Sequence, residues 1–198
     1  MSTEKLGIDI LKEYAKKTGR EYETHDEVHR MGALSVSYQH GRKIYFKNRV
    51  DAPEIFIAYS NPKAFGFQFL FSGVMIPIDI PTKIELFVGP KFGPQIFSSK
   101  PVAKTGNRTF DKKYKITGND DFYATKILGK QQIQTSLLEF FKKNQDYRLI
   151  VNQLNMDFVT PMKDKSFIGL FCKRWETKSE KIEQLFEQIQ DFKTLIHD

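Results

Sequence analysis

The sequence predicts an α+β fold in which helices pack on antiparallel β-meanders. Apolar residues recur with helical spacing near both ends of the chain, and they alternate at every second position through much of the middle. No repeated strand-helix-strand pattern is present, as a parallel sheet would require. We therefore expect helices near residues 3–18, 120–143 and 178–196, with antiparallel strands between them.

The N-terminal part is expected to form one helix followed by a hairpin. Helical spacing over 3–18 is followed by a polar stretch, 21–31, which predicts a connection without regular structure. From Ala33 onward apolar residues alternate with polar ones, and His40-Gly41 offers a turn before the next alternating segment. The tip of the hairpin is therefore predicted at His40-Gly41.

Three further strands are expected before residue 90, at 55–59, around 65–71 and at 84–88. The middle one carries four phenylalanines at every second position, which would place four rings on one face: Phe65, Phe67, Phe69 and Phe71. Such a face is either buried core or an exposed platform on which unpaired bases stack. We favour core, because four exposed rings would make a large apolar patch.

The stretch from Thr105 to Asp120 leads into the regular second part of the chain. Its Phe110-Asp111 pair is expected to enter a short strand, and Gly118-Asn119 supplies a turn before a helix capped by Asp120. None of its residues stands at the spacing of a nucleophile and its base. These residue types favour a structural role.

The second part is expected to continue with a helix interrupted at Gly129, then three strands at 147–151, 156–159 and 167–171, and a last amphipathic helix. Each part of the chain thus resembles a helix with a three-stranded meander, which leaves an internal duplication open.

The predicted domain limits follow from this layout. Residues 1–88 and 108–198 form two parts that an irregular connection, 89–107, joins, or they form one compact domain.

Composition restricts the class of protein. The chain has 198 residues and 18 phenylalanines, enough for a core built of aromatic rings. A single cysteine, Cys172, excludes an internal disulfide and a cysteine-based zinc site, and it favours the reducing cytoplasm. No run approaches the roughly 20 apolar residues of a membrane-spanning helix.

No catalytic, cofactor-binding or metal-binding residues are predicted. His25 and His29 flank two acids, but no third metal ligand lies nearby, and we favour a solvated surface. Asp120 and Asp121 suit helix capping, and Cys172 suits an inert thiol. The chain is therefore expected not to be an enzyme of any standard hydrolytic, redox or phosphoryl-transfer class.

The basic segment 100–148 carries 11 lysines and arginines against 5 acidic residues. Phosphate contacts by its lysines would give salt-dependent binding, and the candidate anion-binding residues are Lys112, Lys113, Lys115, Lys126 and Lys130. A solvated surface is the favoured interpretation of them.

Two functions remain open. The preferred one is a cytoplasmic interaction module that binds another protein, with a second copy of the chain as one form of partner. The alternative is an anion-binding or nucleic-acid-binding module that uses the basic segment.

The chain resembles an uncharacterised family of bacterial proteins that share the pattern Thr-Gly-Asp/Asn-x-x-Phe-Asp-x-x-Phe/Tyr-x-Ile/Val-x-Gly-Asn/Asp. An alanine and a leucine follow in the next helix. The resemblance covers about residues 84–196 and implies no activity and no functional residue. The matching positions are Thr105, Gly106, Asn107, Phe110, Asp111, Tyr114, Ile116, Gly118, Asn119, Ala124 and Leu128.

Overall fold

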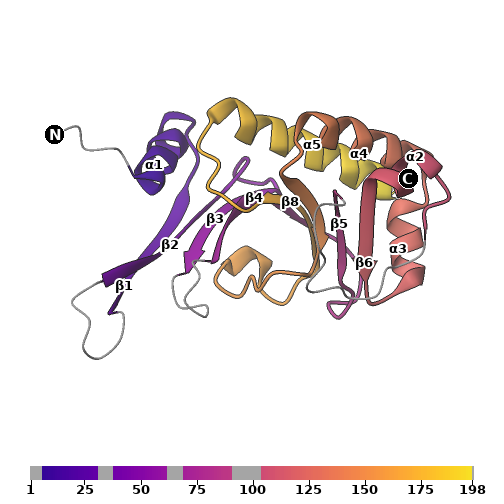
Figure 1. Cartoon of the computed structure of the whole chain (residues 1–198). Helices are drawn as coiled ribbons and strands as arrows, with labels where there is room; N and C mark the ends of the chain where they lie inside the picture. The colour runs from indigo at the N-terminus through magenta and orange to yellow at the C-terminus, as the bar shows by residue number, and fades with distance from the viewer. Residues whose placement is uncertain (1–5, 31–37, 62–68, 91–103, 198) are drawn as a thin grey trace. The chain divides into compact units, whose positions relative to one another are not determined.

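The structure is a computed structural model that describes residues 6–30, 38–61, 69–90 and 104–197. Within these residues the predicted α+β fold is confirmed, with five α-helices and eight strands (Figure 1). The chain divides into two compact units. Unit 1 comprises Met1–Met75 and Cys172–Phe186, and unit 2 comprises Ile76–Phe171 and Glu187–Asp198.

Unit 1 is an antiparallel meander with one helix before it. The strands follow one another in sequence order, and each of the pairs β1–β2, β2–β3 and β3–β4 is antiparallel. The unit also contains the first turns of α5 (Ser179–His197). Its other elements are α1 (Gly7–Lys17), β1 (Tyr22–Arg30), β2 (Tyr38–Lys47), β3 (Ile55–Asn61) and most of β4 (Phe69–Pro77).

Phe46 lies at the centre of the core of unit 1. Its ring stacks on Phe56, the residue opposite it in β3, with 4.9 Å between the ring centroids. Tyr14 of α1 and Phe186 of α5 contact the same ring at centroid distances of 5.7 and 6.4 Å. Both helices therefore cover the face of the sheet on which Phe46 lies.

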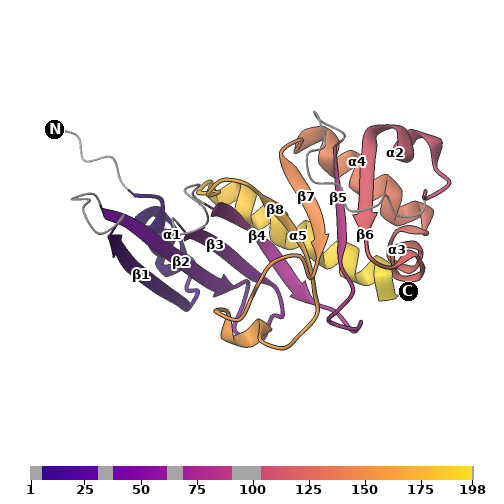
Figure 2. The ribbon, with the colours of Figure 1, turned by 60° about the horizontal axis from the view of Figure 1, so that its bottom comes forward.

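Unit 2 contains four strands in the order β8-β7-β5-β6, and β5 pairs antiparallel with both of its neighbours (Figure 2). Its helices come between β5 and β7 in the sequence, apart from the last turns of α5. The elements are β5 (Leu86–Pro90), α2 (Arg108–Lys113), β6 (Tyr114–Gly118), α3 (Asp121–Leu128), α4 (Gln131–Lys143), β7 (Tyr147–Val151), a 3-10 helix (Thr160–Met162) and β8 (Phe167–Cys172).

A chain of aromatic rings forms much of the core of unit 2. Successive centroids lie 5.2, 5.0, 5.6 and 5.8 Å apart. The rings are those of Phe110, Tyr114, Phe141, Phe140 and Tyr147. The expectation of a core built of phenylalanine is therefore confirmed in both units.

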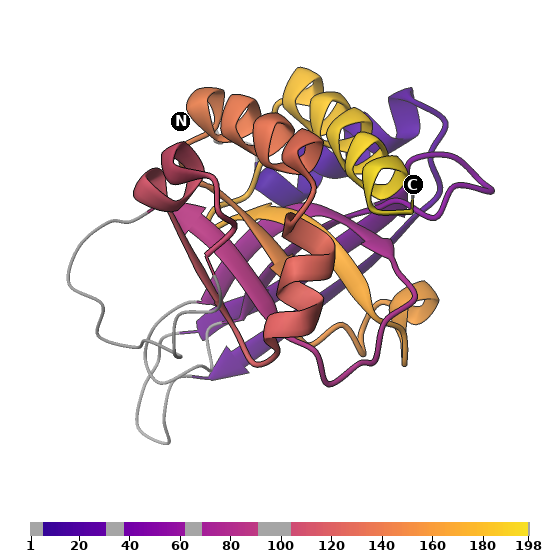
Figure 3. The same cartoon turned by 90° about the vertical axis from the view of Figure 1, so that its right-hand side faces the viewer.

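The end of α5 lies beside α4 in unit 2 (Figure 3). Gln188 Nε2 donates to Ser136 Oγ at 3.1 Å, and Lys130 Nζ donates to the carbonyl oxygen of Leu195 at 3.0 Å. The lysine thus satisfies a carbonyl group in the last turn of α5, where no helical partner is left for it.

Two predictions for the N-terminal part are wrong. Residues 21–31 were expected to form an irregular connection, yet Tyr22–Arg30 forms β1. The expected turn at His40-Gly41 lies inside β2, where Gly41 pairs with Glu27 without a break in register. β1 is exposed on both faces, so its sequence shows no apolar alternation. The predicted strand residues Leu34 and Val36 lie outside the described residues.

Two predictions for the second part are also wrong. Phe110 and Asp111 lie in the short helix α2 rather than in a strand, because the side chain of Asn107 caps that helix through the N–H groups of Thr109 and Phe110. The strand expected at 156–159 is replaced by turns and the 3-10 helix Thr160–Met162. The other predicted strands and helices are found, within a few residues, where the chain is described.

The phenylalanine run is described only in part. Phe71 is buried in β4, and its ring contacts that of Tyr59 at 5.5 Å. Its assignment to the core is thus confirmed. Phe69 begins β4, and Phe65 and Phe67 lie outside the described residues.

Replacing Glu54 by methionine is expected to stabilise unit 1. Glu54 is 3% exposed, and its Oε2 has no hydrogen-bond partner among the described residues. A buried carboxylate oxygen without a partner retains its desolvation cost. Methionine keeps the length of the side chain and removes that cost, so the free energy of unfolding should rise by about 1 kcal/mol. Urea unfolding followed by the fluorescence of Trp175, the only tryptophan, measures it.

Glu176 provides the matched control for Glu54. Its side chain is 5% exposed, but it accepts hydrogen bonds from Arg174 Nη2 at 2.9 Å and from the Lys178 N–H at 3.2 Å. Glu176→Met should therefore lower stability. A loss of stability in both variants would contradict the assignment of Glu54 as an unpaired carboxylate.

Candidate functional site

The carboxylate of Asp111 binds the first two residues of the Thr105–Asp120 stretch. It accepts hydrogen bonds from the N–H and the hydroxyl of Thr105 at 3.0 and 2.9 Å, and from the N–H of Gly106 at 3.2 Å. Gly106 has a φ of 82°, which favours glycine. The spacing of Thr, Gly and Asp in the motif is thus explained by one local clasp, Thr105–Asp111.

The remaining motif residues also have structural roles. Asn107 caps α2, and Phe110 is fully buried against Tyr114. Asn119 joins two loops, because its Nδ2 donates to the carbonyl of Lys83 at 2.7 Å and its Oδ1 accepts from the N–H of Glu85 at 2.8 Å. The motif residues described here therefore stabilise the local fold of unit 2.

The five lysines of the predicted anion site come from different elements of unit 2. They lie in α2, in β6, in α3 and at the N-cap of α4, and they are Lys112, Lys113, Lys115, Lys126 and Lys130. At least two of them contact their own chain. Lys126 Nζ lies 5.8 Å from the ring centroid of Tyr123, and Lys130 donates to Leu195. None of the five lines any of the three hollows described below, of about 50, 360 and 480 Å³.

The other candidate residues also lie in structural settings. Asp120 caps α3 by accepting from the Tyr123 N–H at 3.0 Å. Cys172 is buried beside the hydroxyl of Ser72. His25 is exposed on β1, where its Nε2 lies 2.5 Å from Glu27 Oε1. Among the described residues no group of three His, Cys, Asp or Glu side chains could hold a metal ion.

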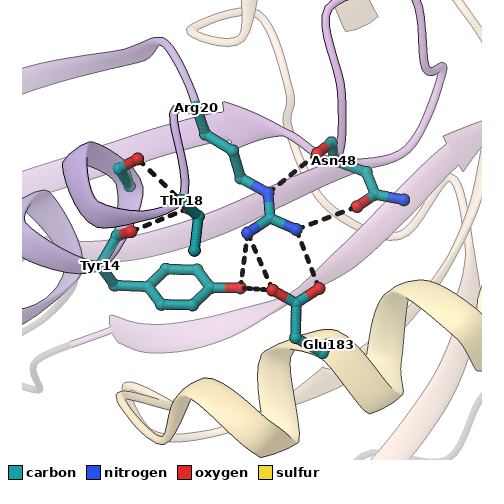
Figure 4. A network of polar contacts seen from close by, with 6 residues as sticks. Tyr14, Thr18, Arg20, Asn48 and Glu183 are labelled. Carbon is teal, nitrogen blue, oxygen red and sulfur yellow. Dashed lines mark hydrogen bonds and ion pairs between the residues drawn. The ribbon is translucent and has the colours of Figure 1, made fainter.

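The most connected polar side chain of unit 1 is Arg20, just after α1 (Figure 4). Its Nη1 and Nη2 each donate to one carboxylate oxygen of Glu183 at 2.8 Å. Nη1 also donates to Tyr14 Oη at 2.9 Å, and Nε donates to the carbonyl of Asn48 at 2.9 Å. The guanidinium carbon lies 5.3 Å from the ring centroids of both Tyr14 and Phe186. Arg20 therefore joins α1, the turn after β2 and the start of α5.

The same network shifts two pKa values. Burial alone would raise the pKa of Glu183, but hydrogen bonds from Arg20 and Tyr14 and the charge of Arg20 outweigh it, so this pKa lies below its usual value. Burial, followed by the hydrogen bond to Glu183, raises the pKa of Tyr14. Both shifts follow from packing, and neither group lines a described pocket.

Two neighbouring grooves of about 360 and 480 Å³ lie on unit 2, and they share Thr82, Asp164 and Lys165. Asn152, at the edge of the first, has a φ of 50° and is held by its own side chain. Its Nδ2 donates to the carbonyl of Ile84 at 2.8 Å, and its Oδ1 accepts from the Phe167 N–H at 2.9 Å. The grooves carry charges of both signs, which come from Asp79, Asp157, Asp164, Lys165 and Lys193.

The strand β1 lies at one edge of the sheet. It is the first strand in the sheet order, and among the described residues it pairs with β2 alone (Figure 1). Six successive residues, from Glu23 to Val28, are exposed. Sequence reasoning missed this strand, although Glu21 to Arg30 contains neither glycine nor proline and includes the β-branched Thr24 and Val28.

A small hollow of about 50 Å³ lies beside β1, and it has room for only a water molecule or two. Its lining combines side chains of both charges and one tyrosine from β1, β2 and β3. These are His25, Glu27, Gly41, Arg42, Lys43, Tyr59, Ser60 and Asn61. This region is thus a polar edge of the sheet beside a hollow of only about 50 Å³.

Comparison with known proteins found no matching family model, no matching curated protein and no matching solved structure. The resemblance to a bacterial family therefore stays a prediction.

None of the helices in the described part of the chain combines the length and the apolar character needed to cross a membrane.

Asp111→Ala is expected to destabilise the protein by about 1–3 kcal/mol, because three donors of the Thr105–Asp111 clasp lose their acceptor. Thermal unfolding measures this change. Asp121→Ala, which removes an exposed carboxylate from α3, is the control and should have a small effect. An Asp111→Ala protein as stable as the wild type would show that the motif is kept for some purpose other than the fold.

Stability should fall at low pH partly through Glu183. Its pKa is lower in the folded protein than its ordinary value of 4.5, so its contribution is complete above that value and is lost as the pH falls through the folded pKa. Above this pH range the free energy of unfolding of Glu183→Gln should be lower than that of the wild type. As the pH falls through the range, it should change less than that of the wild type. Glu187→Gln, an exposed change one turn later, should follow the wild-type curve. Parallel curves for Glu183→Gln and wild type would contradict the role of the network.

Proposed function

We propose that this protein is a cytoplasmic interaction module without enzymatic activity, and that it binds a partner protein through strand addition to β1. The observation that carries the proposal is the edge position of β1, whose nine residues pair with β2 on one side only among the described residues. A partner strand would give each outward N–H and C=O group of β1 a hydrogen-bond partner.

The edge of β1 lacks most of the features that protect sheet edges. It contains no proline, and its register with β2 continues unbroken from Tyr22 to Arg30, so no bulge turns it away. The charges of Glu23, Asp26 and Glu27 are the remaining feature that protects this edge against pairing with other strands. Charges at an edge repel most strands, but they favour a strand of complementary pattern, and they therefore supply specificity.

Two further observations support the proposal. The pKa shifts of Tyr14, Tyr114 and Glu183 have structural causes, because Tyr14 and Glu183 bind each other and Tyr114 packs among core rings. The only cysteine, Cys172, is buried as a free thiol, which supports a reducing compartment.

The alternative, an anion-binding or nucleic-acid-binding module, has weaker support. Its five lysines come from separate elements, and Lys130 already donates to a carbonyl group of its own chain. It becomes one outcome of the test below.

The test uses two neighbouring proline substitutions, Thr24→Pro and His25→Pro. Successive N–H groups of a strand point to opposite sides, so one proline removes an N–H that bonds to β2 and the other removes an N–H on the free edge. Circular dichroism and Trp175 fluorescence identify the variant that keeps the fold. A partner isolated with wild-type protein and then purified should bind this variant at least about tenfold more weakly.

The control for this test is the pair of changes Lys112→Glu and Lys113→Glu, which should leave partner binding unchanged. Equal binding by the folded proline variant and the wild type would contradict the proposal. If instead a mixed oligonucleotide binds with an affinity that falls steeply with salt, and the lysine changes abolish that binding, the nucleic-acid alternative is correct.

A further inference from the structure

We infer that the strand which β1 accepts is β1 of a second copy of the chain, in an antiparallel pair centred on Asp26. This inference rests on the proposed function, because it identifies the partner for the same edge. In this register Tyr22–Arg30 of one copy lies opposite Arg30–Tyr22 of the other, and a two-fold axis passes between the two Asp26 residues. The same nine residues thus form both halves of the contact.

One face of this pair is electrostatically complementary. His25 of each copy lies opposite the partner's Glu27, and the contact occurs twice because of the two-fold axis. The two side chain types already meet within one chain, where His25 Nε2 and Glu27 Oε1 lie 2.5 Å apart. Lys43 is the register partner of His25 in β2, so the positive side of the contact continues into the next strand. An imidazole opposite a carboxylate stabilises a strand pair, as an ion pair when the histidine is protonated and through a hydrogen bond when it is neutral.

The other face contains the one unfavourable contact and the means to reduce it. Asp26 lies opposite the partner's Asp26, and like charges in this position are destabilising. Within each chain, however, Arg42 is the register partner of Asp26, and its Nε lies 3.3 Å from Asp26 Oδ2. Each aspartate therefore brings its own counter-charge, and the centre of the pair is close to neutral.

Apolar contact adds to the second face. Thr24 lies opposite the partner's Val28, again twice. Val28 is 58% exposed in the single chain, which is unusual for a valine in a strand. In the pair it would lie beside the Thr24 methyl group. The strand is therefore complementary to itself in backbone, charge and apolar contact, and only Asp26 opposes association.

The test exchanges the charges of the two opposed residues. His25→Glu places two carboxylates opposite each other twice, and Glu27→Lys places a lysine opposite each His25. Each single variant should self-associate at least about tenfold more weakly than the wild type in sedimentation equilibrium. An equimolar mixture of the two should associate again, since the introduced glutamate then faces the introduced lysine and each remaining Glu27 faces His25.

Asp26→Asn provides a test with the opposite sign. Removing the central pair of like charges should strengthen self-association, whereas Arg42→Gln, which removes the counter-charge, should weaken it. Both side chains are partly exposed, so neither change should unfold the protein.

The outcomes separate this inference from the proposed function. A wild-type protein that stays monomeric at high concentration, or one whose dimer ignores all four changes, overturns the inference. If such a monomer still binds a different partner that the folded proline variant loses, the proposed function stands and only the identity of the partner is wrong. If His25→Glu and Glu27→Lys each lose the dimer and their mixture recovers it, the result supports the inferred dimer and the proposed function together.

Discussion

The guanidinium group of Arg20 is the contact on which unit 1 depends. Arg20 contacts α1, the turn after β2 and the start of α5, because it donates five hydrogen bonds and packs against the rings of Tyr14 and Phe186. Its side chain is 10% exposed, so the charge is almost removed from water and requires the bidentate carboxylate of Glu183. The flat guanidinium also packs between rings in a way that a lysine ammonium would not.

Elsewhere the fold uses single polar side chains to satisfy loop backbone. Ser72 accepts from the Glu176 N–H and donates to the carbonyl of Arg174, both at 2.8 Å, and so holds the chain after β8. Asp111, Asn119 and Asn152 do the same in unit 2. Each such side chain gives hydrogen-bond partners to backbone groups of loops, which regular secondary structure does not pair. This explains why these polar residues stand out in the sequence.

The sequence predicts the fold class, the apolar helices and the buried strands well, because burial imposes a period on them. It fails at β1, where both faces are exposed and no period is imposed, and at Phe110, where capping by Asn107 overrides the alternation of the following strand. It also fails at 156–159, where turns close on Met156 and Val159 instead. The Arg20 network is invisible in the sequence because Arg20 and Glu183 are 163 positions apart.

The discontinuity of unit 1 has a consequence for its synthesis. The unit consists of Met1–Met75 and Cys172–Phe186, so nearly the whole of unit 2 is translated before Glu183, the carboxylate partner of Arg20, and Glu176, a partner of Ser72, have been made. Unit 1 therefore departs from the usual order in which N-terminal regions fold first on the ribosome. Until Glu183 and Phe186 have emerged, the face of Phe46 lacks one of its two covering helices. A nascent chain stalled before that point would display an aromatic surface to chaperones.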